Sequence, residues 1–187
     1  MNAICADEFT LEPQTAGHAG AMFSVLSDPA IYEFENEPPP SLSWLAERYS
    51  RLESRRSPNG DEDWLNWVIR LPGGELVGFV QATVRKDRPA RIAYVLGSRY
   101  WGRGYAFRAV RAMMNEVAQA YGACDFAAIF KRRNVRSRRL LERLGFAESS
   151  SAVSGLFDVE PDEVVMDLRS CAIASIARPN NGAGTDI

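Results

Sequence analysis

Residues 92–106 read IAYVLGSRYWGRGYA, and this stretch decides how the chain is organised. An apolar run of β-forming residues leads into a turn punctuated by Gly102 and Gly104, after which a helical pattern begins. A strand, a glycine-containing turn and a helix N-terminus in this order leave several backbone N–H groups unpaired and pointing the same way. The stretch therefore predicts a binding site for a phosphate group.

The helix after the turn is predicted from periodicity. Its apolar residues recur at the spacing of one buried face, at Ala106, Val110, Met113, Met114, Val117 and Tyr121. Gly122 is placed to end the helix in a left-handed conformation. Taken alone, the two glycines of the turn are weak support for a phosphate site, because an ordinary tight strand-to-helix connection uses the same residues.

A second motif strengthens the prediction. Asn134 begins the run NVRSRRLLERLGF, which follows a strand-like segment at residues 124–130. The two motifs, in this order and spacing, resemble the signatures of the GNAT superfamily of acyl-CoA-dependent N-acyltransferases. The branch most similar is that of the ribosomal-protein N-terminal acetyltransferases (RimJ/RimL-like). The resemblance covers residues 9–168 and departs from the family pattern at Trp101, where Gln or Arg is usual.

The resemblance implies a fold and a cosubstrate. We expect a single-domain α/β GNAT fold at residues 1–169, with a mixed, twisted sheet of six or seven strands and about four flanking helices. Acetyl-CoA would lie in a gap between two central strands. Residues 170–187 show no periodicity and little apolar surface, and we expect them to form a flexible tail.

The resemblance also implies which residues bind acetyl-CoA. The pantetheine arm would pair with the strand backbone at Tyr94, Val95 and Leu96, and an N–H of Val95 or Leu96 would hold the thioester carbonyl. The pyrophosphate would accept hydrogen bonds from the backbone amides of Gly102, Arg103, Gly104, Tyr105 and Ala106.

Asn134 and Ser137 lie one helical turn apart, and their role can be interpreted in two ways. From the residues alone they are a helix N-cap and a polar first-turn residue. By resemblance they flank the pantetheine and belong to the catalytic set. The tyrosine that often donates a proton to the CoA thiolate would fall at Leu141, so Ser137 is implied as the donor, with water as the alternative.

The general base is harder to place. The family often has a glutamate at the start of the central strand, but this chain has Arg91. Glu35, Glu37 and Asp63 are the alternatives, and Glu35 is preferred because its acidic, proline-rich loop resembles the segment that walls the acceptor site. These carboxylates have a simpler interpretation too, as solvated loop residues or as attractors of a cationic amine.

A dense basic run precedes and enters the second motif, at Lys131, Arg132, Arg133, Arg136, Arg138, Arg139 and Arg143. Three roles are open: a solvated helix face paired partly with Glu142, contact with the 3′-phosphate of CoA, or contact with RNA or the ribosome.

The remaining elements follow from periodicity and turn signals. Helices are predicted at residues 15–26 and 41–56, a hairpin at residues 63–71 and 75–85, and a last strand pair at residues 146–151 and 163–168. The segment 31–40 contains three prolines and cannot be a regular helix. Gly78 interrupts the second hairpin strand and predicts a close approach of two backbones.

Composition excludes several classes. The chain has 187 residues, 46% of them hydrophobic, and a net charge of −2, which suits one globular domain. Its three cysteines are far apart, Cys124 is expected in the core, and the only histidine, His18, is far from both motifs, so no metal is expected. With no membrane-length apolar run and no signal-peptide pattern, we expect a cytoplasmic protein.

The predicted function is N-acetylation of a primary amine by direct attack within a ternary complex, with a protein or peptide N-terminus as the first choice of acceptor. A small cationic amine, such as a polyamine, an aminoglycoside or an amino-acid derivative, is the alternative. A non-catalytic CoA sensor or an RNA-binding protein of the same fold remains open as well. Homodimers are common among such proteins, although the sequence shows no interface.

Overall fold

A mixed β-sheet organises the protein, whose computed structural model describes residues 1–6, 8–34 and 36–169. Across these residues the sheet has eight strands in the order β1-β2-β3-β4-β5-β6-β8-β7. The strands are β1 (Ile4–Ala6), β2 (Phe9–Pro13), β3 (Asp63–Arg70), β4 (Leu76–Arg85), β5 (Arg88–Leu96), β6 (Phe126–Lys131), β7 (Ala147–Glu148) and β8 (Glu163–Leu168). The α-helices are α1 (Ala19–Leu26), α2 (Leu42–Leu52), α3 (Tyr105–Tyr121), α4 (Val135–Arg143) and α5 (Ser151–Ser154).

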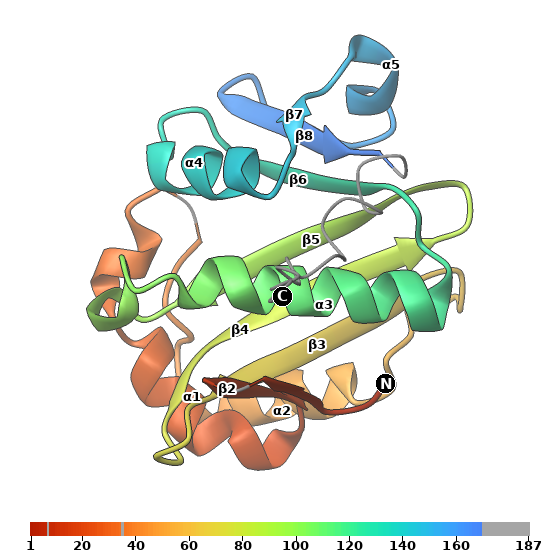
Figure 1. Ribbon diagram of the computed structural model, residues 1–187. Helices are drawn as coiled ribbons and strands as arrows, with labels where there is room; N and C mark the ends of the chain where they lie inside the picture. The colour runs from red at the N-terminus through yellow and green to blue at the C-terminus, as the bar shows by residue number, and fades with distance from the viewer. Residues whose placement is uncertain (7, 35, 170–187) are drawn as a thin grey trace, which may run out of the picture.

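One parallel contact lies in the middle of this otherwise antiparallel sheet. β5 and β6 run parallel, while every other neighbouring pair is antiparallel. Parallel neighbours need a crossover connection, and α3 supplies it across one face of the sheet (Figure 1). The N-terminus of α3 therefore follows directly after the end of β5.

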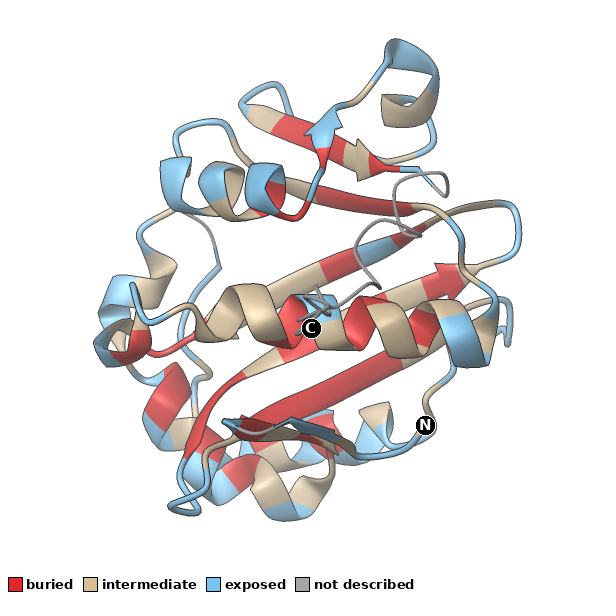
Figure 2. Cartoon of the chain, viewed as in Figure 1, coloured by how far each residue is buried: buried red, intermediate tan, exposed pale blue. Residues whose placement is uncertain are grey.

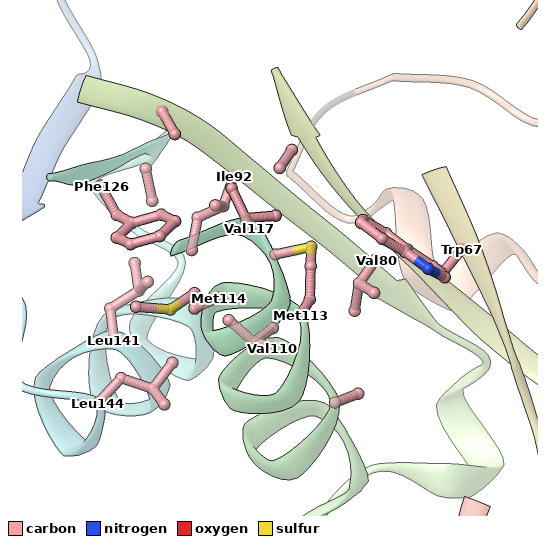
Figure 3. Packing of buried hydrophobic residues seen from close by; sticks show 14 of the residues in the cluster. Trp67, Val80, Ile92, Val110, Met113, Met114, Val117, Phe126, Leu141 and Leu144 are labelled. Atoms are coloured by element: carbon pink, nitrogen blue, oxygen red, sulfur yellow. The ribbon is translucent and has the colours of Figure 1, made fainter. Parts of the chain in front are cut away.

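Two hydrophobic clusters hold helices on the two faces of the sheet. On one face, Met113 and Val117 of α3 are fully buried; Met113 lies toward Val80 of β4, and Val117 lies toward Ile92 of β5 (Figure 3). On the other face, Met22 of α1 and Leu45 of α2 belong to the second cluster. Buried residues run along the central strands beneath the helices (Figure 2). Both faces of the central strands are therefore covered.

The central helix and the hairpin form where the sequence predicts them, and the mixed α/β fold class is confirmed. α3 extends to Tyr121, and Gly122 follows it with a φ of 68°. β3 and β4 pair as an antiparallel hairpin. A β-carbon added at Gly78 would lie 2.1 Å from the carbonyl oxygen of Val95. The expected close approach of two backbones is thus present between β4 and β5.

Some element boundaries differ from the prediction. The sheet has eight strands rather than six or seven, because β1, of three residues, is too short to show alternation. β7 keeps only two residues of the strand predicted at 146–151. α2 ends at residue 52 rather than 56, since the chain turns there and Arg55 adopts a φ of 57°. The first helix is divided into a 3-10 turn (Ala16–His18) and α1. The predicted tail at residues 170–187 lies outside the described residues.

Two single-residue expectations have different outcomes. Cys124 is exposed, so its predicted burial is wrong; β6 begins two residues later, at Phe126. His18 is held locally, its ring lying 3.2 Å from both the hydroxyl of Thr15 and a carboxylate oxygen of Glu12. These local contacts are consistent with the incidental role that the sequence predicts.

Candidate active site

The site is built on a gap between β5 and β6. These strands pair only at Ala90 with Phe126 and at Arg91 with Ala127. β5 then continues to Leu96 beside β4, whereas β6 continues beside β8. Within the described residues, one edge of β5 is therefore left without a strand partner over residues 92–96. Such an edge offers N–H and C=O groups to an extended ligand.

The direction of these backbone groups follows from the pairing. The N–H of Ala90 donates to the carbonyl oxygen of Asp125 at 2.9 Å, so the backbone groups of Ala90 face β6. Successive residues of a strand direct their N–H and C=O groups to opposite sides. The backbone groups of Tyr94 and Leu96 consequently face the gap, and those of Val95 face β4.

The end of β5 confirms this alternation. The N–H of Gly97 donates to the carbonyl oxygen of Val77 on the β4 side at 3.0 Å. On the gap side, the carbonyl oxygen of Leu96 accepts a hydrogen bond of 2.9 Å from the indole of Trp101. The Leu96 N–H is left to bind a ligand. Of the two residues expected to hold a thioester carbonyl, the geometry favours Leu96 over Val95.

A cradle of backbone amides lies between β5 and α3. Gly102 and Gly104 have φ values of 74° and 78°, a left-handed conformation that other residues adopt only with strain. Gly104 is the N-cap of α3 and has no side chain to cap it. The N–H groups of residues 102–107 donate to no backbone or side-chain acceptor in the described chain. Together with the positive end of the helix dipole, they form an anion-binding site.

A cavity of about 390 Å³ joins the amide cradle to the gap. Its walls come from β5, from the turn and first residues of α3, and from α4. The predicted cofactor residues found in its lining are Tyr94, Val95, Leu96, Gly102, Gly104, Tyr105, Ala106, Asn134 and Ser137. Arg103, which the sequence also predicts, is exposed beside the cavity and is not among its lining residues. Residues far apart in the sequence are thus brought to one site.

Asn134 and Ser137 lie at the start of α4, on the cavity wall. Asn134 is the N-cap of the helix, and its side-chain oxygen accepts a 3.0 Å hydrogen bond from the Ser137 N–H. The interpretation of Asn134 as a helix N-cap is therefore confirmed. The side chain of Ser137 lies on the cavity wall beside Tyr94, with which it interacts, and it can also contact a ligand in the cavity.

Tyr94 adds a side chain where the sequence predicted only a backbone role. Its hydroxyl lies 3.5 Å from the carbonyl oxygen of Ser137, across the gap. Burial raises the pKa of Tyr94 to about 12, so the phenol is neutral at physiological pH and can donate a hydrogen bond. The side chain of Tyr94 projects from the same face of β5 as Ile92 and Leu96, but nothing in the sequence indicates that its hydroxyl reaches α4.

Arg136 ties α4 to the mouth of the cavity. Its guanidinium lies 4.2 Å from the ring centroid of Trp101 and forms a 2.6 Å ion pair with Glu33. The same group lies 5.5 Å from the ring of Phe34. Trp101, at the position where the family usually has Gln or Arg, thus holds an arginine from another element. Nothing in the sequence indicates this contact.

The residues of the basic run have two kinds of environment: some form ion pairs with acidic residues, and others line the cavity. Its expected partner, Glu142, makes no ion pair with it among the described residues; the acids that do are Glu33, Glu148, Glu160, Asp162 and Glu163. Lys131 is surrounded by the last three, and its hydrogen bonds to Glu160 and Asp162 raise the pKa of its ammonium group. Arg139 and Arg143 instead line the cavity and present cations to it.

Of the three candidate bases, Asp63 is the one that the structure shows to lie away from Ser137. Glu35 lies outside the described residues. Glu37 is exposed in the proline-rich loop. Asp63 forms a 3.3 Å ion pair with Arg56 at the start of β3. From the strand register and a rise of about 3.3 Å per residue, Asp63 is about 17 Å from the row of β3, β4 and β5 that contains Val95.

An extended ligand that carries a phosphate at one end fits this arrangement. Its chain can pair with the free edge of β5, and its phosphate can accept hydrogen bonds from the amides before α3. Within the described residues, no three His, Cys, Asp or Glu side chains are grouped to hold a metal. None of the described helices combines the length and the apolar character of a membrane span. The class defined by this geometry is that of proteins that bind a CoA thioester.

Comparison with known proteins gives the family. A family model described as an acetyltransferase (GNAT) domain matches residues 8–147. The chain therefore belongs to the GNAT acetyltransferases and is an acetyl-CoA-dependent N-acetyltransferase. No curated protein sequence matches it significantly.

Solved structures share the fold at low sequence identity. A ribosomal-protein-S5-alanine acetyltransferase from Vibrio fischeri is 15% identical, with a TM-score of 0.72, 90% of this chain covered and 96% of that one. A ribosomal L7/L12 α-N-protein acetyltransferase in complex with coenzyme A is also 15% identical, with a TM-score of 0.72 and coverages of 89% and 97%. A chimeric spermidine N-acetyltransferase from Vibrio cholerae is 16% identical, with a TM-score of 0.70 and coverages of 92% and 100%.

Proposed function

We propose that this N-acetyltransferase acts on the N-terminal amine of a peptide or protein. The observation that supports this acceptor is a polar groove of about 250 Å³ on the α2 face of the sheet, opposite α3. Asn66 of β3 and Gln81 of β4 line it and are directly paired across the two strands. Side-chain amides in a row offer both donors and acceptors, which suits the backbone of an extended peptide.

The groove leads toward the proposed position of the thioester. Gln81 pairs with Ala93 of β5, and Ala93 lies two residues before Val95 on the same face of the strand. At about 3.3 Å per residue, this separation is about 7 Å. An amine lying in the groove can therefore reach the free edge of β5 from the face that α3 does not cover.

The residues of the chain have distinct roles in this proposal. The amine nitrogen attacks the thioester carbon, a C–N bond forms and the C–S bond breaks, while the Leu96 N–H stabilises the carbonyl oxygen. The departing thiolate takes a proton from the hydroxyl of Ser137, which we assign as the donor, and Ser137 regains a proton, through water, from the one that the acylated nitrogen releases. Asn134 holds the first turn of α4 and thereby positions Ser137. The amides of residues 102–106 and the cations Arg139 and Arg143 bind the phosphates.

Glu35 remains our proposed base, acting through water on the ammonium form of the acceptor. Its neighbours support this choice: Glu33 pairs with Arg136, and Phe34 lies against Arg133 and Arg136 at the mouth of the cavity. Glu35→Gln should lower kcat and remove the lower limb of the pH–rate profile, whereas Glu37→Gln should change neither.

A small cationic amine is the second candidate acceptor. It is supported by the carboxylates of the same loop and by the fold shared with a spermidine N-acetyltransferase. The deciding experiment is amine-dependent release of free CoA thiol, measured with short peptides bearing a free N-terminus and with spermidine. Faster release with peptides supports the proposal, and release with spermidine alone contradicts it.

A further inference from the structure

The groove on the α2 face carries positive charge. Arg48 of α2 and Arg91 of β5 both line it, and both are exposed. Arg48 lies 5.6 Å from the ring centroid of Trp44 and forms no ion pair within the described residues. The backbone of Arg91 pairs with β4 and β6, but its side chain makes no hydrogen bond, ion pair or ring contact with any residue that the structure describes. Two guanidinium groups therefore face one groove without a carboxylate bound to either.

The acid in the groove wall does not neutralise them. Glu62 is the one carboxylate among the described residues that line the groove. Its side chain accepts a 2.8 Å hydrogen bond from the indole of Trp64 and lies 3.8 Å from the guanidinium of Arg85. Arg85 also pairs with Asp61 and Asp87 and therefore offsets the charge of Glu62 only in part, but two guanidinium groups against one carboxylate leave the groove lining with a net positive charge.

The position of Arg91 connects this charge to the reaction. On β5, Arg91, Ala93 and Val95 alternate along the face of the sheet toward α2, while Ile92 and Leu96 belong to the cluster on the α3 face. Arg91 lies four residues before Val95, a separation of about 13 Å at 3.3 Å per residue. Because the arginine side chain is long, its guanidinium can reach a group that lies beside Ala93. An acceptor whose anionic group binds Arg91 could therefore place its amine near Val95.

We infer that the acceptor carries a carboxylate close to its amine, which Arg48 and Arg91 bind. This inference rests on the proposed function and specifies its substrate: a peptide with an acidic residue near the N-terminus, or a short peptide whose own C-terminal carboxylate reaches the groove. Guanidinium groups bind carboxylates with paired, charge-assisted hydrogen bonds. A polyamine would instead be repelled by both arginines.

Matched acceptors separate these sources of the carboxylate. The panel consists of Ala-Ala-Ala with a free C-terminus, its C-terminal amide, the amides of Ala-Asp-Ala, Ala-Asn-Ala and Ala-Lys-Ala, and spermidine. We expect kcat/KM for the Asp peptide or the free acid to exceed that of its neutral counterpart about tenfold, as a charged hydrogen bond is worth in binding. Which of the two acids is preferred identifies the source.

Variants assign the preference to the groove. Arg91→Gln and Arg48→Gln should each reduce the preference to within about twofold, and Arg91→Glu should reverse it in favour of the Lys peptide. Arg51→Gln is the control, because Arg51 is exposed on α2, pairs with Glu47 and does not line the groove. Arg48 and Arg91 are on the surface, so thermal melting should show all four variants folded.

The outcomes distinguish this inference from the proposed function. If thiol release is equally fast with the Asp, Asn and Lys peptides, the anion site is excluded while peptide acetylation stands. If no peptide supports thiol release, the anion site is tested independently of turnover, by calorimetric titration of the CoA-saturated protein with N-acetyl-Ala-Asp-Ala-amide. Binding that is lost in Arg91→Gln supports the anion site; binding no tighter than that of the Asn analogue overturns it.

Discussion

Ser137 is the side chain on which the proposed proton transfer depends. Its side chain lines the cofactor cavity beside Tyr94. We expect Ser137→Ala to lower kcat about 100-fold, the lower range of general acid catalysis, while the Kd for acetyl-CoA changes little. Steady-state kinetics and calorimetry measure the two quantities.

The control for Ser137 is Ser149→Ala, whose hydroxyl instead bonds the carboxylate of Asp167 beside β8. This variant should keep its kcat. A kcat for Ser137→Ala within about threefold of the original would mean that water protonates the thiolate, since one missing general acid normally costs far more.

Tyr94 makes a pH-dependent contribution to stability. Burial raises its pKa from the ordinary value of 10.0 to about 12. Between these values the folded protein binds more protons at this site than the unfolded chain, so stability falls as the pH rises through this range. Below pH 10 the contribution is fully present. Tyr94→Phe should therefore reduce the loss of stability in urea unfolding measured from about pH 10 to 12.

Other tyrosines limit the size of that effect. Burial also raises the pKa of Tyr49, which lies between α2 and the sheet, so the alkaline loss should be reduced and not abolished. Tyr105→Phe is a suitable control, because Tyr105 is only half-buried at the start of α3, with Arg108 5.3 Å from its ring. Parallel pH curves for the original protein and Tyr94→Phe would contradict the prediction.

At the scale of elements, the spacing of β4 and β5 depends on Gly78. A β-carbon there would collide with backbone atoms of Val95 and Leu96, at 2.1 and 2.9 Å, and a backbone cannot rotate away as a side chain can. Gly78→Ala should therefore destabilise the protein by about 3 kcal/mol, the upper part of the range for overpacking. Gly73→Ala, in the adjacent turn with nothing within 4 Å, should change stability by less than about 0.5 kcal/mol.

Urea unfolding of the two glycine variants tests this point. Equal unfolding midpoints would show that β5 can shift away from β4 at little cost. This result would contradict the rigid strand edge on which the proposed thioester contact depends. A large loss for Gly78→Ala alone would support that edge.

Much of the element order could be predicted, because it depends on local patterns. The helix that ends at Gly122 shows its apolar face in the sequence, and Gly78 marks a close approach without naming its partner. Contacts between distant segments could not be predicted. Arg136 meets Glu33 across 103 residues, and no periodicity links a loop to a helix. The short edge strand β1 could not be predicted for a similar reason, since its pairing with β2 defines it more than its composition does.

The candidate site also has a part that depends on local patterns and a part that depends on contacts between distant segments. Its backbone part, the strand edge and the amide cradle, follows from strand, turn and glycine signals and could be predicted. Its side-chain part could not be predicted. The Tyr94 hydroxyl reaches Ser137 from another element, and Arg91 can be assigned a role only because the fold brings it into one groove with Arg48. Catalytic side chains depend on tertiary placement, which one sequence does not record.

At the scale of the whole molecule, the charges are unevenly distributed. The chain has a net charge of −2, yet Arg139 and Arg143 face the cofactor cavity, and Arg48 and Arg91 face the groove on the other side of the sheet. Both ligand sites are therefore positive within a nearly neutral protein. Acetyl-CoA binding should weaken as salt rises, because its phosphates meet these cations and the amide cradle.

Ligand binding should also stabilise the whole fold. A ligand at 100 times its Kd adds about 2.7 kcal/mol to the free energy of unfolding, which for a domain of this size raises Tm by roughly 5–10 °C. Thermal melting with acetyl-CoA, and with desphospho molecules such as pantetheine as the control, measures the effect. An unchanged Tm at saturating acetyl-CoA would contradict binding to the folded state.

The most direct measurement is calorimetric titration of acetyl-CoA into the original protein, Gly104→Ala and Gly122→Ala. Both glycines have left-handed φ values, 78° and 68°, at opposite ends of α3, so each alanine should cost a similar 1–2 kcal/mol of stability. Only Gly104 lies in the amide cradle. We predict saturable binding that weakens tenfold or more in Gly104→Ala and is unchanged in Gly122→Ala; equal affinities for all three proteins would place the cofactor somewhere other than the turn before α3.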